Sequence, residues 1–487
     1  MNDHSGLLCV GGRRQATPHR NGILGRRGAR IGGPFFTLRR QLWLHATLDF
    51  NIPEYRLMID LLPLPNEEFF CVCSNTKLVN EAFILTGMMP VVQGRCPKCG
   101  RRLLSHPQYG WKFGSRLQYD ESDNSVVTAD NLEWYVNMFR SAMASRGQPA
   151  PGLSRVTHRP LGRNVVIVNA VEPTYGHILQ RLFSIEAMAH DLEGADLLVI
   201  VPRHAAWLVP DGAAELWIVE APATALSSWN QAVADAVAAL ADQVDRLRLA
   251  PLRLGGYAVD ISRFTRVKPF DPRLATHVAP ARLCISWRED RCWTYRGQPL
   301  ETSAAIVEQF TMYSQMLDMV RAEIPDLEVT VFGYGRKGTF APWVEDLRNT
   351  EHDPEMEKTW AQRCSQSHLV FGIQGSNMIL PAGHAFGSVE LMPLHNWAHN
   401  MATWEWVNRM AARTAMQRYL HIPLSTSFSD VVSIVFIQLR RMQQQSLWLT
   451  RTQPLDADES SRLALAAISI AKPVQPLEYR NAAGQVM

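Results

Sequence analysis

The chain of 487 residues carries 49 Lys and Arg against 46 Asp and Glu, which gives a formal net charge of +3. This balance excludes a general electrostatic affinity for nucleic acid or anionic membranes. A hydrophobic content of 46% is enough for a sizeable core in two or three domains. No run reaches the roughly 18 to 20 apolar residues that a membrane span needs. The composition therefore predicts a globular protein without a transmembrane segment.

The N-terminal region, residues 1–48, is rich in Arg, Gly and Pro and lacks the apolar stretch of a secretory signal. We expect a disordered tail here. A transit peptide or an overextended gene start would have a similar composition, so the tail does not fix a location.

Residues 49–125 combine short β-prone runs with four of the eight cysteines. Cys96 and Cys99 stand in a Cys-Pro-x-Cys-Gly knuckle, whose turn aims two thiolates at one ion and whose Gly accepts a left-handed backbone. Cys71 and Cys73 are separated by one residue instead of the usual two to four. We predict a structural zinc site with four thiolates in a zinc-ribbon-like module. Free thiols are the alternative, and His106 could replace one ligand.

A new domain begins after this module and is expected to span residues 126–275. A short helix over Asn131–Arg140 leads into a Gly- and Pro-rich linker. Apolar strand patterns at 163–171, 195–202 and 215–222 alternate with helical patterns, the last of them a long helix over Ser227–Leu247. This alternation predicts a parallel sheet covered by helices.

The alternation restarts in residues 276–450, after a Pro-containing stretch. A strand at 281–290 precedes a helix with one apolar stripe, which consists of Ile306, Phe310, Tyr313, Leu317, Val320 and Ile324. Strands at 327–335, 368–375 and 388–393 alternate with further helices. We expect an α/β fold class with two Rossmann-like parallel-sheet domains, and a C-terminal helix and tail at 451–487.

The segment Val370 to Pro393 offers the clearest functional signal. A buried strand ends at Gly375, and Ser376 and Asn377 open a short helix that is expected to stop at Pro381. Gly permits close approach of a ligand, and free amides at a helix start attract a diphosphate. Glu390, at the end of the next strand, is expected to accept the ribose hydroxyls. A capped strand-to-helix turn without a ligand is the alternative.

This segment resembles the signature of glycosyltransferase family 61. The matching residues are Gly372, Gly375, Asn377, Pro381, Gly383, Glu390, Leu391 and Pro393. The match departs from the family in the register of its first Gly, in Ser376 where Thr is usual, and in three extra residues, His384 to Phe386. Thr174 to Met188 resembles the family's Tyr-Gly-His opening helix on the acceptor side. Cys284 to Trp293 resembles its Arg-bearing strand end.

The resemblance covers about residues 163–425 and implies a GT-B-type enzyme with two Rossmann-like halves facing a cleft. It implies inverting transfer from a nucleotide sugar, linked to UDP or GDP, to a hydroxyl of a glycan, lipid-linked or protein acceptor. Arg288 and Arg291 are expected to neutralise the diphosphate. An exposed loop in which they pair with Glu289 and Asp290 is the alternative. His177 is the expected base, with local capping or packing as its alternative role. Other possible bases are Glu186, Glu289 and Asp290.

No catalytic metal is expected, because the only Asp-x-Asp triplet, Asp456 to Asp458, lies in a polar C-terminal stretch. A Gly-rich loop with Arg336 and Lys337 is a weaker phosphate-binding pattern. Since family relatives in eukaryotes are usually membrane-anchored and this chain shows no anchor, we expect a cytoplasmic protein or one peripheral to the inner face of a membrane.

Two other functions remain open. The zinc-ribbon-like module and its neighbours Arg95, Lys98, Arg101 and Arg102 would suit a non-enzymatic protein that binds nucleic acid or another protein. Paired Rossmann halves also occur in pyruvyl and phosphosugar transferases, and fold alone does not distinguish these from glycosyltransferases.

Overall fold

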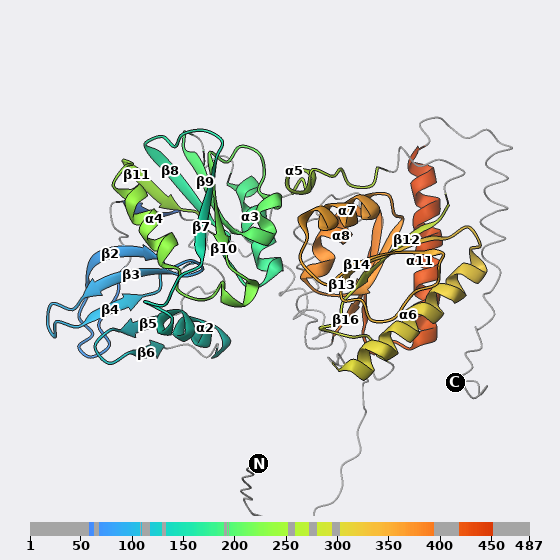
Figure 1. The fold of residues 1–487 in the computed structure, drawn as a ribbon, viewed down its shortest axis with the longest axis horizontal. Helices are drawn as coiled ribbons and strands as arrows, with labels where there is room; N and C mark the ends of the chain where they lie inside the picture. Colours follow the sequence, from blue (N-terminus) through green and yellow to red (C-terminus); the bar gives the residue numbers. More distant parts are fainter. Residues whose placement is uncertain are drawn as a thin grey trace, which may run out of the picture. The chain divides into compact units, whose positions relative to one another are not determined.

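The computed structural model describes residues 58–62, 68–107, 109, 117–128, 133–188, 192, 194–251, 259–271, 280–294, 302–393 and 418–450. The described residues belong to one compact unit, and their strands form three sheets (Figure 1). The predicted tail at 1–48, the C-terminal helix and tail at 451–487, and the Asp456 to Asp458 triplet lie outside the described residues.

The N-terminal α/β sheet has the strand order β1-β11-β8-β9-β10-β7. Its four central strands are parallel: β8 (Asn164–Asn169), β9 (Asp196–Pro202), β10 (Glu215–Glu220) and β11 (Arg246–Leu249). Antiparallel strands form its edges, β1 (Ile59–Leu62) and β7 (Gly152–Thr157). Successive β8 residues pack on opposite faces, Val165 with α4 (Gln231–Ala241) and Val166 with α3 (Tyr175–Ala187). Helices on both faces explain the continuous apolar runs.

The C-terminal α/β sheet is entirely parallel and has the order β14-β13-β12-β15-β16-β17. Its strands are β12 (Arg282–Trp287), β13 (Glu328–Tyr334), β14 (Val344–Asn349), β15 (Leu369–Ile373), β16 (Gly387–Met392) and β17 (Tyr419–Pro423). Numbered from β12, this is the 3-2-1-4-5-6 order of doubly wound folds. The predicted α/β class with two Rossmann-like sheets is confirmed.

Two long helices cover one face of this sheet, α6 (Ser303–Glu323) and α11 (Phe428–Thr450). The predicted stripe faces that core: Tyr313, Leu317 and Val320 are buried, and Ile306 and Phe310 pack against the same cluster. On the opposite face, α7 (Pro354–Ser365) buries Trp360 and Cys364 against β15 and β13. The shorter helices are η2 (Arg203–Leu208), η3 (Ala223–Ala225), α5 (Ser262–Thr265), η5 (Ser376–Met378) and α8 (Ile379–His384).

The cysteine-containing region forms an antiparallel meander of five strands, followed by α2 (Glu133–Ala144). The strands are β2 (Val79–Leu85), β3 (Pro90–Arg95), β4 (Arg102–Ser105), β5 (Leu117–Asp120) and β6 (Ser125–Thr128). Its core is continuous with that of the N-terminal sheet, and Asn169 donates to the carbonyl of Gly87 at 2.7 Å. The meander does not include β1, which falls within the predicted module at 49–125 but pairs with β11 of the N-terminal sheet.

The long helix predicted over Ser227–Leu247 is wrong in length. Asn230 caps α4 by accepting from the amide of Val233, and the helix ends at Ala241. Leu247 lies in β11, where it pairs with Val165. The helical apolar spacing runs directly into the alternating Arg-Leu-Arg-Leu strand, so periodicity alone did not reveal the break.

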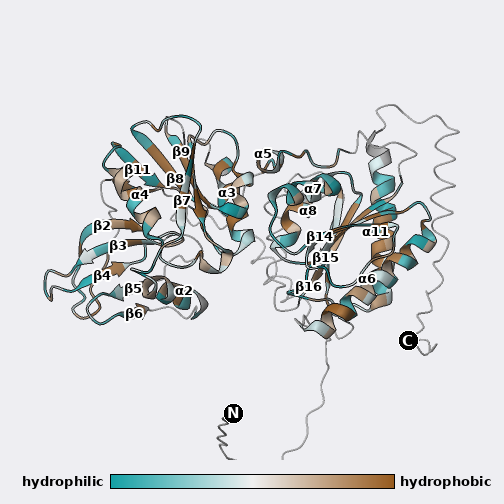
Figure 2. Cartoon of the chain, in the orientation of Figure 1, coloured by the Kyte–Doolittle hydropathy of each residue, from teal (hydrophilic) through white to brown (hydrophobic). Residues whose placement is uncertain are grey.

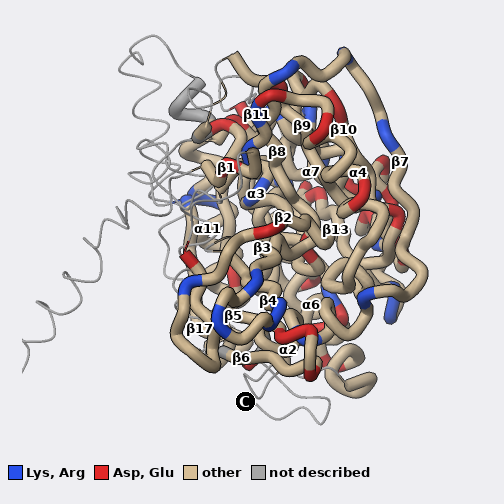
Figure 3. Tube along the Cα trace, turned by 90° about the vertical axis from the view of Figure 1, so that its left-hand side faces the viewer, with Lys and Arg blue, Asp and Glu red and all other residues tan. Residues whose placement is uncertain are grey.

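Apolar residues concentrate along the strands of the α/β sheets (Figure 2), whereas basic and acidic residues are interspersed along the chain in the view of Figure 3. This mixture matches the formal net charge of +3. Among the described helices, none combines the length and apolar character needed to cross a bilayer.

Candidate functional site

A pocket of about 560 Å³ lies at the carboxyl ends of β12, β13, β14 and β15. In the strand order, β13 lies on one side of the adjacent strands β12 and β15, and β16 lies on the other. The chain therefore leaves β12 and β15 in opposite directions, and the loops that follow them diverge. Doubly wound folds bind ligands at such a switch point. Phe332, Tyr334 and Trp360 provide aromatic lining, while Arg288 and Asn377 provide polar groups. The volume is suitable for a ligand of nucleotide-sugar size.

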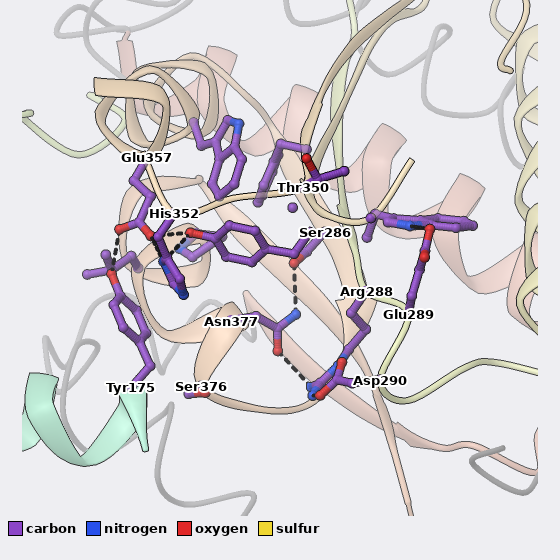
Figure 4. Close-up of a pocket in the computed structure, with 18 of the residues that line it drawn as sticks. Tyr175, Ser286, Arg288, Glu289, Asp290, Thr350, His352, Glu357, Ser376 and Asn377 are labelled. Atoms are coloured by element: carbon purple, nitrogen blue, oxygen red, sulfur yellow. Dashed lines mark hydrogen bonds and ion pairs between the residues drawn. The ribbon is translucent and has the colours of Figure 1, made fainter. Parts of the chain in front are cut away.

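Arg288 follows β12 directly, and its guanidinium is held from several sides (Figure 4). It donates from Nε to Asp290 at 2.7 Å and from Nη1 to the Asn377 amide oxygen at 3.0 Å. Asn377 in turn donates to the hydroxyl of Ser286 at 2.9 Å. Burial opposes ionisation of Asp290, but the hydrogen bonds and charge of Arg288 outweigh it and lower the pKa of this carboxyl. The result is a preorganised cation on the pocket wall.

Gly375 is required by this arrangement. Its backbone is extended, and a Cβ at this position would meet Nη1 of Arg288 and lie 2.8 Å from the Asn377 side-chain oxygen. The group that approaches the backbone of Gly375 closely is the Arg288 guanidinium, and the close approach of a ligand there stays a prediction. Ser376 also lines the pocket, and its Cβ lies 2.8 Å from where a Cβ on Gly176 of α3 would stand.

The helix after Gly375 differs from the prediction. Neither Ser376 nor Asn377 caps it through its side chain, and α8 runs on to His384 instead of stopping at Pro381. Pro381 lies in the first turn of α8, where a proline has no intrahelical N–H bond to lose. Because η5 and α8 are short, they add little positive potential, and the positive charge at this end of the pocket is that of Arg288, which the paired Asp290 partly offsets.

Two other predicted donor-side residues do not line the pocket. Arg291 donates to the backbone carbonyl of Gln374 at 3.0 Å, and so supports the loop after β15. Glu390 lies within β16, between Gly372 of β15 and His421 of β17, and is fully buried. Burial raises the pKa of Glu390 to about 8. Its carboxyl is therefore not presented at the strand end as expected, because β16 continues past Glu390 to Met392.

His177 lies in the first turn of α3, with Nδ1 3.3 Å from Glu172. Glu172 also pairs with the buried Arg181 at 3.2 Å. This network would orient the imidazole, but His177 is not among the described residues that line the pocket.

Of the alternative bases, Glu289 and Asp290 line the pocket, whereas Glu186 is engaged by Arg263 at 2.8 Å. Glu289 accepts hydrogen bonds from the Trp287 indole and the Lys337 amide. The loop with Arg336 and Lys337 is therefore fixed to Glu289 through its backbone.

Sequence reasoning missed a polar cluster on the same pocket. Glu357 of α7 is buried and accepts from Tyr175 at 3.0 Å and from Tyr334, and its Oε1 lies 3.1 Å from Nδ1 of His352 (Figure 4). The Trp207 indole donates to the same carboxylate at 3.2 Å. The one signal in the sequence for this cluster is the position of His352 in a loop after a parallel strand. That strand, β14, was not predicted, because charged residues interrupt its apolar pattern.

Three of the four predicted metal-binding cysteines, Cys71, Cys73 and Cys99, bring their sulfurs into one cluster, which does not include Cys96. Sγ of Cys71 lies 3.1 Å from Sγ of Cys73 and 3.6 Å from that of Cys99, and the Cys73 and Cys99 sulfurs are 3.2 Å apart. Tetrahedral zinc with Zn–S bonds of about 2.3 Å would place its sulfurs about 3.8 Å apart. These three thiols could therefore hold a metal ion. Sγ of Cys96 lies 3.4 Å from the hydroxyl of Ser74. Hydrogen bonds, first from Ser74 and then from the backbone of Cys99 and Lys98, lower the pKa of Cys96 to about 6.

The two knuckles have the same backbone hydrogen bonds. The Cys71 amide donates to Thr76 and the Asn75 amide to Cys71, as the Cys96 amide donates to Arg101 and the Gly100 amide to Cys96. Asn75 and Gly100 both have positive φ, 48° and 75°. The left-handed glycine expected in the second knuckle is confirmed.

The two knuckles differ in the position of their second cysteine, which accounts for the irregular spacing of Cys71 and Cys73. Cys99, three residues after Cys96, corresponds to Ser74, three residues after Cys71. Cys73 reaches the same sulfur cluster from one position earlier. His106, the alternative ligand, is instead buried and lies 3.0 Å from the Tyr135 hydroxyl.

The basic residues beside the knuckles are largely paired with acids. Arg95 binds Glu81 at 2.7 Å, and Arg101 binds Asp120 at 2.7 Å. Arg102 lies 3.6 Å from the same Glu81. These pairs reduce the positive potential available for binding nucleic acid.

No protein-family model and no curated protein sequence matches the chain. Among solved structures, it is similar to the ADP-heptose lipopolysaccharide heptosyltransferase II of E. coli, with 9% identity and a TM-score of 0.33 over 58% of this chain and 99% of that one. It is also similar to the glycosyltransferase SnogD of Streptomyces nogalater, with 12% identity and a TM-score of 0.23 over 60% and 78% of the two chains.

A third similar structure is a putative UDP-N-acetylglucosamine 2-epimerase of Listeria monocytogenes, with 13% identity and a TM-score of 0.26 over 62% of this chain and 81% of that one. These TM-scores are too low to support a functional inference. The fold assignment above rests on this chain's own strand order and pairing.

Proposed function

We propose that the chain is a glycosyltransferase that moves a sugar from a nucleoside-diphosphate donor to an acceptor hydroxyl. The observation that carries this proposal is the guanidinium of Arg288, fixed by Asn377 and Asp290 on the wall of the switch-point pocket. The resemblance of the Gly375 to Asn377 segment to family 61 points to the same donor class. The acceptor is a glycan, a lipid-linked precursor or a protein.

In the proposed reaction, the acceptor oxygen attacks the anomeric carbon as the bond from that carbon to the diphosphate oxygen breaks. One displacement inverts the anomeric centre. Arg288 stabilises the negative charge that develops on the departing diphosphate, and its fixed position avoids reorganisation during the step. A base takes the acceptor proton, and His177 is the candidate that the sequence supplies. Transfer without a catalytic metal remains part of the proposal.

The donor's nucleoside has a suitable surface in the aromatic lining. Phe332, Tyr334 and Trp360 could stack with a uracil or guanine ring. The proposed ribose contact of Glu390 would require its buried carboxyl to become exposed, so Glu390 has no part in the proposed donor site.

Titration calorimetry with UDP and GDP tests the donor site. Arg288→Ala removes the charge-assisted contacts and should weaken binding of the preferred diphosphate at least tenfold, since such hydrogen bonds contribute about 1.5 to 3 kcal/mol. Asn377→Ala should weaken it less, because the charge remains. Arg363→Ala is the matched control: this arginine pairs with Glu345 and does not line the pocket.

Binding of neither diphosphate by the wild-type protein, or equal affinity in Arg288→Ala, would contradict the donor proposal. A screen of UDP- and GDP-sugars for nucleotide release, with mass spectrometry of the products, then identifies the sugar. Stabilisation by an unrelated phosphorylated metabolite alone would favour another group transferase.

We further propose that Cys71, Cys73, Cys96 and Cys99 bind one structural zinc ion. The three clustered sulfurs and the matching knuckle backbones support this assignment. Four thiolates leave no position for a reactive water, so the ion would hold the two knuckles together without taking part in catalysis. Elemental analysis of the purified protein should give one zinc per chain.

A further inference from the structure

His352 occupies the loop between β14 and α7 and lines the same pocket as Arg288 and Asn377. Its side chain is 45% exposed, whereas that of its partner Glu357 is 7% exposed. In Figure 4 the imidazole lies across the pocket from the Arg288 guanidinium. A half-exposed imidazole backed by a buried carboxylate is the arrangement expected of a proton acceptor.

The hydrogen bonds around Glu357 fix the tautomer of this imidazole. Tyr334 has one hydroxyl proton and donates it to Glu357, so its oxygen can only accept from His352, whose Nδ1 lies 2.7 Å away. Nδ1 of His352 also lies 3.1 Å from Glu357 Oε1. Nδ1 must therefore carry the proton, which leaves the lone pair on Nε2.

The other groups packed around His352 preserve this state. Tyr175 donates to the second oxygen of Glu357, and burial raises the pKa of Tyr175, which keeps its hydroxyl proton in place. His204, whose ring centroid lies 5.1 Å from that of His352, has its pKa lowered to about 4, chiefly by burial. It therefore adds no competing charge at neutral pH. Asp353 caps the start of α7 by accepting from the amide of Glu355.

We infer that His352, oriented by Glu357, is the base that removes the acceptor proton in the sugar transfer proposed above. The acceptor oxygen bonds to the anomeric carbon, the diphosphate leaves with the electron pair of the broken carbon–oxygen bond, and the acceptor proton moves to Nε2. His352 lies on the pocket that holds Arg288, whereas His177 is not among the described residues of its lining. Glu357 is a positioning residue.

Hydrolysis of the preferred nucleotide sugar tests this role with water as the acceptor. His352→Gln should lower kcat about 10²- to 10⁴-fold, the usual effect of removing a general base, while the Kd for UDP or GDP stays within about twofold. Azide attacks as an anion and needs no base, so azide-dependent nucleotide release should persist in this variant. Glu357→Gln should lower kcat less and keep the azide reaction.

His158→Gln is the control, because this exposed histidine lies outside the pocket. Unchanged hydrolysis by His352→Gln would overturn the inference. So would weaker diphosphate binding with kcat retained, since His352 would then contact the donor. Azide rescue confined to His177→Gln would assign the base to His177. If the wild-type protein binds neither diphosphate and releases nucleotide from no sugar donor, glycosyl transfer itself fails, and this inference fails with it.

Discussion

Gly375→Ala tests the donor site separately from the fold, because the added Cβ would meet the ends of two side chains and no backbone atom. That Cβ would meet Nη1 of Arg288, and it would lie 2.8 Å from the Asn377 side-chain oxygen. The guanidinium must therefore move and lose its hydrogen bonds to Asn377 and to the Gln374 carbonyl. Since the backbone at Gly375 is extended, alanine fits without backbone strain.

The expected loss of binding follows from the contact that the displaced guanidinium would no longer make with the diphosphate. Displacing a hydrogen-bonded charged group costs about 1.5 to 3 kcal/mol, which corresponds to roughly 10- to 150-fold weaker binding of the nucleoside diphosphate. The melting temperature should change by no more than about 4 °C. Alanine also lowers the conformational entropy of the unfolded chain, which stabilises the folded state by up to about 1 kcal/mol.

Titration calorimetry and thermal unfolding measure the two effects separately. Gly152→Ala is a matched control: its added Cβ would lie 3.8 Å from its nearest neighbour, Glu220, at ordinary contact distance. A Gly375→Ala protein that binds UDP or GDP as tightly as the wild type would refute the proposed role of the fixed guanidinium.

Three further outcomes test other parts of the structure. Burial raises the pKa of Glu390 in the folded state, so the free energy of unfolding should fall as pH rises from about 4.5 to 8, by at most about 1.4 kcal/mol per pH unit. Glu390→Gln should flatten this decline, measured by urea denaturation at several pH values. An equal decline in the variant would contradict the role of Glu390. Cys73→Ser should lower bound zinc, and adding Ser74→Cys should restore it by giving the first knuckle the spacing of the second; zinc retained by Cys73→Ser alone would remove Cys73 as a ligand. Asn169→Ala should destabilise the protein by about 1 to 3 kcal/mol, because it leaves the buried carbonyl of Gly87 unpaired; unchanged urea denaturation would refute this.

Local pattern was sufficient for most of the two α/β sheets. Runs such as Val165 to Val168 are apolar at every position, and the stripe of α6 repeats at helical spacing, because both elements bury residues in a regular order. Elements without that regularity were missed. In β14, Glu345, Asp346 and Arg348 interrupt the apolar pattern, and Arg348 is buried by pairing with Asp346 and nearby carbonyls.

The donor side of the candidate site was partly predictable for the same reason. Arg288 and the Gly375 to Asn377 turn follow strands that are recognisable from sequence, and parallel strands bring their carboxyl ends to one edge. Glu390 was misplaced because β16 continues past it to Met392. The tertiary packing around this strand leaves the Glu390 carboxyl fully buried.

By itself, the sequence determined the alternation of strands and helices, the paired cysteine knuckles and the loop that carries Gly375. Each is set by neighbours within a few residues, through backbone conformation and the spacing of buried side chains. The tertiary structure alone decided the environment of Glu357, whose partners Tyr175, Trp207 and Tyr334 are distant in sequence. It also decided that Arg288 lies over Gly375. Such contacts depend on how complete elements pack, and local sequence does not encode that packing in a readable pattern.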